Sequence, residues 1–139
     1  MAINENTTIG AKTVFDPDYI FDEAALPNAT TSTSSAFEIG GSQNALEIVG
    51  IADTETVVGD GETLKYELYT ATTSTGAYTL SDTLVSYTPS GTTTTIDADT
   101  QMFRFSPTTD TKQWGKVVIT ATENQSGETS TVYIDYVSR

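Results

Sequence analysis

The sequence contains no cysteine and no histidine, and it has few basic residues. Of its 139 residues, 19 are acidic and 6 are basic, so the net charge is −13. Without cysteine and histidine, the chain cannot form a disulfide framework, a Cys/His zinc site or a catalytic centre built on either side chain. The shortage of Lys and Arg argues against nucleic acid and anionic membranes as partners. We therefore expect no cofactor and no metal site.

Long apolar runs are also missing from the sequence. No stretch approaches the run of about 18 apolar residues that a transmembrane helix needs. The segment Met1 to Gly10 has neither the basic cluster nor the apolar core of a secretory signal, so we expect none. A chain of this length fits one domain of ordinary size.

Threonine is the commonest residue, and it indicates β-structure. The chain has 28 threonines and 12 serines. The branched Cβ of threonine suits a pleated strand better than a helix. Alternation of apolar and polar residues supports this interpretation in several short runs. We expect strands near residues 36–39, 46–52, 63–70, 83–88, 92–95, 101–105, 116–122 and 131–137.

Many short strands with turn residues between them predict an all-β, antiparallel β-sandwich of jelly-roll type. The polar loop 123–128 contains a glycine, so strands 116–122 and 131–137 are predicted to form a hairpin. The one helix candidate, Tyr19 to Leu26, is one or two turns long. The predicted core consists of Phe37, Ile39, Leu46, Ile48, Leu64, Tyr66, Leu68, Phe103, Phe105, Val117, Ile119, Val132 and Ile134.

The first 34 residues differ from the rest of the chain. They combine apolar residues with the low-complexity run Asn28 to Ser35, which cannot pack a core by itself. We divide the chain into an extended N-terminal arm, residues 1–34, and a sandwich domain, residues 35–139. One interpretation is an arm that binds a neighbouring subunit; the other is a frayed terminus with a small docked segment. The expected anchors of the arm are Phe15, Tyr19, Phe21 and Leu26.

Close carboxylate pairs are the remaining candidates for acid–base chemistry or calcium binding. A glycosidase needs two carboxyls across a cleft, one with its pKa raised by burial. All the pairs lie in polar, turn-like surroundings, and the EF-hand pattern is not matched. We expect surface acids and no enzymatic activity. The pairs are Asp16 with Asp18, Asp22 with Glu23, Asp60 with Glu62, and Asp97 with Asp99.

Aromatic residues suggest a second class of function, carbohydrate binding or adhesion. Tyrosine and tryptophan side chains stack on sugars, but they also fill cores and form subunit contacts. A glycan-binding module predicts a row of exposed aromatic side chains on one face. The plausible members are Tyr69, Tyr78, Tyr87 and Tyr133, with Trp114 near an edge of the core.

The order of strands and turns resembles the small jelly-roll capsid cement, or decoration, proteins of tailed bacteriophages. The resemblance covers about residues 19–137, and it is a pattern of strands and turns without a catalytic motif. It includes a Leu-x-x-x-Leu-x-Thr strand at Leu64 and a Gly-Lys-Val step at Gly115. The matching segments are Phe37 to Gly41, Leu46 to Ala52, Leu64 to Thr70, Phe103 to Pro107 and Gly115 to Thr120.

This resemblance implies a structural virion protein that binds the outer capsid surface and bridges capsomers. The implied partner is the major capsid protein of a phage shell, and the implied assembly is a homo-oligomer, a dimer or a trimer. The place of action would be the capsid exterior, after synthesis in the bacterial host cytoplasm, where a chain without cysteine folds readily. An acidic surface keeps such a protein soluble before assembly.

Overall fold

The computed structural model describes residues 18–40, 46–108 and 111–136. Within these ranges the chain forms eleven strands and no α-helix, so the predicted all-β class is confirmed. The strands are β1 (Asp18–Ala25), β2 (Thr31–Thr33), β3 (Phe37–Glu38), β4 (Leu46–Ala52), β5 (Thr56–Val58), β6 (Leu64–Ala71), β7 (Thr79–Tyr87), β8 (Thr94–Ile96), β9 (Thr100–Phe105), β10 (Trp114–Ala121) and β11 (Thr129–Tyr136).

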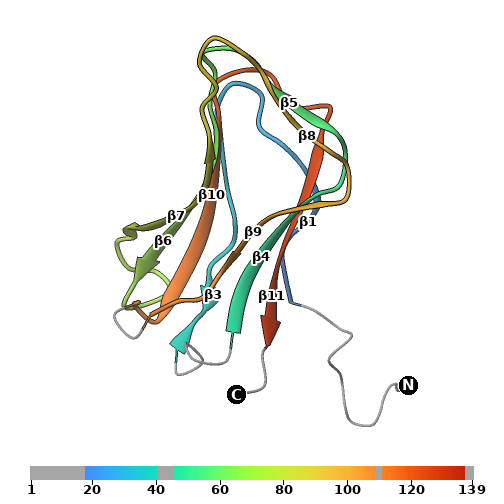
Figure 1. Cartoon of the computed structure of the whole chain (residues 1–139). Helices are drawn as coiled ribbons and strands as arrows, with labels where there is room; N and C mark the ends of the chain where they lie inside the picture. The colour runs from blue at the N-terminus through green and yellow to red at the C-terminus, as the bar shows by residue number, and fades with distance from the viewer. Residues whose placement is uncertain (1–17, 41–45, 109–110, 137–139) are drawn as a thin grey trace, which may run out of the picture.

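Two antiparallel sheets pack face to face as a sandwich (Figure 1). The first sheet has the strand order β1-β11-β4-β9. The second has the order β2-β10-β6-β7, and β3 pairs with β10 on the same edge as β2. Strands β5 and β8 form a small third sheet at one end of the sandwich, the top of Figure 1.

The chain repeatedly crosses from one sheet to the other. It runs from β1 in the first sheet to β2 and β3 in the second, returns to β4, and then forms β6 and β7 in the second. It crosses again to β9, to β10 and finally to β11. This order is compatible with a jelly roll, in which eight strands form two sheets through Greek-key connections.

The core lies between the two sheets and follows the alternation of the strands. Every predicted core residue belongs to it: Phe37 and Phe105 are partly buried, and the other eleven are buried. Gly50 on β4 packs so closely against the ring of Phe103 that a Cβ at this position would overlap the ring. The hydroxyl of Tyr66 on β6 donates a buried hydrogen bond of 2.8 Å to Oγ of Ser130 on β11. This bond joins the two sheets through the core.

The predicted hairpin between the last two strands is wrong. β10 pairs with β2, β3 and β6, whereas β11 pairs with β1 and β4, so the two strands lie in different sheets. Hydrogen bonds fix the loop 123–128, which connects β10 in the second sheet to β11 in the first. Buried Gln125 donates from Nε2 to the carbonyl of Val57 at 2.7 Å, and Glu123 accepts from the backbone N–H of Gly59 at 2.7 Å. A polar loop with a glycine can therefore connect strands in two different sheets as well as the two strands of a hairpin.

The described part of the expected arm, residues 18–34, belongs to the sandwich. The predicted helix Tyr19 to Leu26 is instead strand β1, which pairs with β11, and β2 pairs with β10. The backbone of this segment finds its hydrogen-bond partners about a hundred residues away, in strands that local sequence patterns do not reveal. Among the described residues the sandwich therefore begins at Asp18, earlier than the boundary expected at residue 35.

In the part of the chain that the structure describes, no helix has the length and apolar character needed to cross a membrane.

Candidate functional surface

The four expected arm anchors have different surroundings. Phe15 lies outside the described residues. Leu26 is only 3% exposed and belongs to the core, and Phe21 packs against the core while half-buried. Tyr19 is 53% exposed, so it is the one of these three described anchors whose side chain is largely available to a partner.

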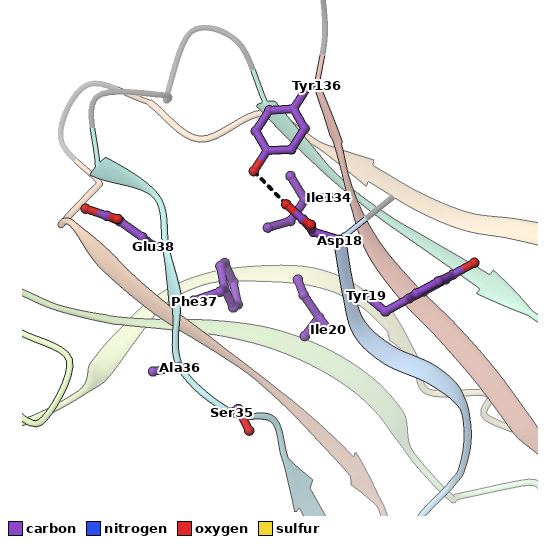
Figure 2. Close-up of a pocket in the computed structure, with 9 residues that line it drawn as sticks. All are labelled: Asp18, Tyr19, Ile20, Ser35, Ala36, Phe37, Glu38, Ile134 and Tyr136. Carbon is purple, nitrogen blue, oxygen red and sulfur yellow. Dashed lines mark hydrogen bonds between the residues drawn. The ribbon is translucent and has the colours of Figure 1, made fainter. Parts of the chain in front are cut away.

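A pocket of about 280 Å³ opens at the edge of the sandwich between β1 and β3 (Figure 2). Its apolar lining includes Ile20, Phe37 and Ile134, which Figure 2 shows between the two strands. Asp18 and Glu38 add carboxylates to its wall. An apolar lining with acidic groups suits a partner side chain that carries a positive charge on an apolar stem.

The acidic groups of the pocket already accept hydrogen bonds within the chain. The hydroxyl of Tyr136 donates to Oδ2 of Asp18 at 2.9 Å, and Nε2 of Gln113 donates to Oε2 of Glu38 at 3.0 Å. Burial, together with the bond to Asp18, raises the pKa of Tyr136 above its ordinary value, so this hydroxyl remains a donor. The two carboxylates are thus oriented by neighbouring donors rather than by each other.

The expected carboxylate pairs lie in turns and at strand edges. Asp60 accepts from the N–H of Gly91 at 2.6 Å, and Glu62 accepts from the hydroxyl of Thr122 at 2.6 Å. Within the described residues, no group of three or more acidic side chains is arranged to hold a metal ion. Asp16 lies outside the described residues, and the other acids are exposed except half-buried Glu62. Asp60 thus holds a turn in place, and the exposed acids of these pairs contribute surface charge.

The outer face of the second sheet carries a different combination of side chains. Because Leu64, Leu68 and Val117 point into the core, their neighbours on β6 and β10 point outward. One end of this face thereby gathers five residues, which we name the lysine–aromatic face: Tyr69, Tyr78, Leu80, Trp114 and Lys116.

Cross-strand register brings these five residues together from three strands and one loop. Lys116 on β10 is opposite Tyr69 on β6, and Tyr69 is opposite Leu80 on β7. The ammonium of Lys116 lies 4.6 Å from the ring centroid of Tyr78, a distance typical of a cation–π contact. Leu80 is 53% exposed, and the other four side chains are half-buried. The face thus combines aromatic area with a positive charge.

The row beside the lysine–aromatic face is nearly neutral. Val118, Glu67 and Thr83 are opposite one another across three strands. Buried Glu67 forms an ion pair with Lys65 at 3.6 Å. The outer side of the second sheet therefore presents two lysines and one paired acid along β6 and β10. A second acid lies at the edge of this face, because Glu38 on β3 is opposite Trp114 in the register.

The outer face of the first sheet is organised around Arg104. This residue on β9 forms ion pairs with Glu47 on β4 and with Asp135 on β11, the second at 3.0 Å. The bonds to these two carboxylates raise the pKa of Arg104. Val49 lies between Arg104 and Tyr133 in the register and is fully buried although it points away from the core. Arg104, Glu47 and Asp135 are thus paired within the molecule.

The four tyrosines expected to form a glycan-binding row do not share one face. Tyr69 and Tyr78 belong to the lysine–aromatic face, but Tyr87 packs against the core. Tyr133 lies on the other sheet, opposite Tyr19 in the register. All four are half-buried. The expected row is therefore reduced to two tyrosines, with half-buried Trp114 near them on β10.

The lysine–aromatic face could not be assembled from the sequence, although Tyr69, Tyr78 and Trp114 were each singled out there. The sequence places Lys116 in a strand but does not say which strand lies beside it. The chain matches no protein-family model, and comparisons with curated proteins and with solved structures find no match either.

Proposed function

We propose that this protein is a structural, non-enzymatic module that binds the outer surface of a phage capsid and reinforces the shell by bridging capsomers. The observation that carries the proposal is the lysine–aromatic face, which offers Tyr69, Trp114 and exposed Leu80 around a lysine. Tyrosine, tryptophan and exposed aliphatic side chains are typical of protein–protein contact surfaces.

The architecture supports the same proposal. The strand order is compatible with the jelly roll of the cement proteins that the sequence resembles. The rest of the surface is strongly acidic, which favours solubility and disfavours contact with packaged DNA. The proposed partner is the major capsid protein, and the proposed location is the exterior of the virion after synthesis in the host cytoplasm.

The proposed mechanism is stabilisation by mass action. A protein that binds the assembled shell but not its dispersed subunits stabilises the shell by its binding free energy. An oligomer bound at several points of the lattice gains avidity, so each individual contact needs only modest affinity.

Co-sedimentation with purified phage shells tests this proposal. The shells should come from the phage whose genome encodes the protein. Two preparations are compared: shells that keep their native decoration and shells from which it has been removed. We expect saturable binding and a higher temperature of shell disruption. The variant Ser90→Glu/Thr95→Glu, which adds two charges at exposed positions away from the face, serves as a control and should bind like the wild type. Shells that neither bind the protein nor gain stability would exclude the decoration role.

A carbohydrate-binding or adhesin module of a phage tail or cell surface is the second candidate. Tyr69, Tyr78 and Trp114 share the lysine–aromatic face, and such side chains can stack on sugar rings. This function predicts saturable glycan binding that is lost in Tyr69→Ala. A glycan array without any binder, together with binding to shells, would favour the decoration role.

A further inference from the structure

The pocket between β1 and β3 reaches the hydrophobic core from one edge of the sandwich. β1 is the edge strand of the first sheet, and β3 lies at an edge of the second. Ile134 belongs to the core, and Ile20 and Phe37 pack against it, so the apolar lining is continuous with the core. Ligand pockets usually measure about 300–1,000 Å³, and this one measures about 280 Å³. It therefore suits one side chain rather than a cofactor.

The charge of the pocket is negative, and no base of the lining balances it. The lining residues include Asp18 and Glu38 but neither lysine nor arginine. None of the ion pairs found among the described residues includes either acid. The hydrogen bonds that the two carboxylates accept come from the phenol of Tyr136 and the amide of Gln113, which are neutral donors. A cationic group would complement this pocket.

Asp18 is the carboxylate that a group inside the pocket would reach. It is opposite Ile134 in the register, and Figure 2 shows the two side by side in the gap between β1 and β3. The carboxylate of Glu38 lies at the outer rim, on the far side of β3. Oδ2 of Asp18 already accepts from Tyr136. This favours the single-point contact of an ammonium over the two-oxygen contact of a guanidinium.

Exposed tyrosines indicate that the ammonium comes from a protein. Four large hydrophobic side chains of the described residues are exposed, and two of them, Tyr19 and Tyr136, line this pocket at 53% and 57% exposure. Tyrosines around a buried anchor are typical of protein-contact surfaces. A free alkylamine would leave both rings in water, whereas a protein that inserts a side chain would cover them.

We infer that the pocket between β1 and β3 binds a lysine side chain of a protein partner, with its stem between Ile20 and Phe37 and its ammonium on Asp18. Lysine buries its stem along apolar surface while its charged end stays near water. No residue of the lysine–aromatic face lines the pocket, so the two sites are separate contacts. This assignment rests on the proposed function only in taking the partner to be a protein.

Titration of the ¹⁵N-labelled protein with n-butylammonium, which reproduces the end of a lysine side chain, tests the pocket by NMR. The amide shifts of β1 and β3 should saturate with a Kd of about 1–10 mM, because the probe has few atoms. Methylammonium carries the charge without the stem, and n-butanol carries the stem without the charge. Each should bind about fivefold more weakly or worse.

A matched pair of variants tests the role of Asp18. Asp18→Asn removes the charge but keeps an oxygen that can accept from Tyr136. It should weaken n-butylammonium binding about three- to tenfold and leave n-butanol binding unchanged. Asp97→Asn changes the net charge equally at an exposed position beside β8, at the other end of the sandwich (Figure 1). It should bind n-butylammonium within about twofold of the wild type. Thermal unfolding establishes that both variants fold.

Equal binding of n-butylammonium and n-butanol, or equal effects of Asp18→Asn and Asp97→Asn, would overturn the inference. Binding that appears only in Lys12→Gln or Arg139→Gln would also overturn it, because the occupant would then be a base of this chain. If the partner is a shell, Asp18→Asn should bind shells about threefold more weakly or worse. Shells that bind Asp18→Asn and the wild type equally would refute the pocket and leave the decoration role standing. Probe binding as expected, with shells that ignore the wild type, would do the reverse.

Discussion

The two sheets of the sandwich share one core but present opposite kinds of outer surface. On the first sheet, Arg104 is paired with Glu47 and Asp135, so its charge is satisfied inside the molecule. On the second sheet, Lys116 lies over Tyr78, and the ion pair between Lys65 and Glu67 is one row away. A face whose charges are already paired has little to gain from a partner. The outer side of the second sheet is therefore the one that we propose as the binding surface.

Truncation of one core side chain from each sheet tests whether their inner faces are equivalent. Ile48 on β4 and Ile119 on β10 are both fully buried in the same cluster. Ile48→Ala and Ile119→Ala should each lower the free energy of unfolding by about 2–5 kcal/mol, through lost burial and the cavity left behind. Urea denaturation measures both. A cost confined to one of the two variants would contradict a core shared equally by the sheets.

The hydrogen bond between Tyr66 and Ser130 tests how strongly the two sheets are joined. Tyr66→Phe leaves the buried hydroxyl of Ser130 without its donor and should cost about 1–3 kcal/mol of unfolding free energy. The double variant Tyr66→Phe/Ser130→Ala removes both partners and should cost less than the sum of the single changes. Additive costs would mean that the bond does not couple the sheets.

Alkaline pH should weaken the sandwich through the same tyrosine. Burial raises the pKa of Tyr66 above its ordinary value of 10.0, and burial also raises the pKa of Tyr87. The folded state then retains protons that the unfolded chain releases, so this stability is complete below pH 10 and decreases as the pH rises further. Urea denaturation between pH 8 and about 11 should give a steeper loss for the wild type than for Tyr66→Phe. Equal slopes would contradict the assignment.

The smallest effects are expected on the outer faces, and they should differ between the sheets in salt dependence. Arg104→Gln should cost about 0.2–1 kcal/mol at low ionic strength, because its ion pairs are solvent-exposed. At about 1 M salt this cost should almost vanish, because the Debye screening length is then only about 3 Å.

Lys116→Gln is the matched change on the second sheet. It removes one contact with Tyr78 and should cost no more than about 0.5–1 kcal/mol of unfolding free energy. Its larger effect should be on association, where the charge faces a partner. If Lys116→Gln destabilised the monomer as much as a core truncation, the lysine would be a structural element and not a binding residue.

Alternation in the sequence predicted most of the strands because it reports directly which residues face a core. The strand Leu46–Ala52 was predicted with its observed bounds, and all predicted core residues lie in or against the core. Alternation does not tell which strands are neighbours. The hairpin between β10 and β11 was predicted wrongly for this reason, because both strands have a buried face and a polar loop joins them.

The candidate surface was harder to predict than the core. Lys116 and Tyr78 are far apart in the sequence and meet only because β10 lies beside β6. Likewise, no pattern in residues 18–34 predicts that β1 pairs with β11 and that β2 pairs with β10. Local patterns identify the elements, whereas the surface depends on tertiary register.

The positions of β10 and β11 have a consequence for biosynthesis. β11 lies between β1 and β4, and β10 lies between β2 and β6, so the last two strands of the sandwich occupy interior positions in its sheets. Until a ribosome has made residues 114–121, the strand with which β2 and β3 pair in the structure is missing, and β1 lacks its partner until residues 129–136 are made. The sandwich can therefore form only after its C-terminal strands emerge. Its many distant pairings predict slow folding, and a truncated product would expose unpaired edges prone to aggregation.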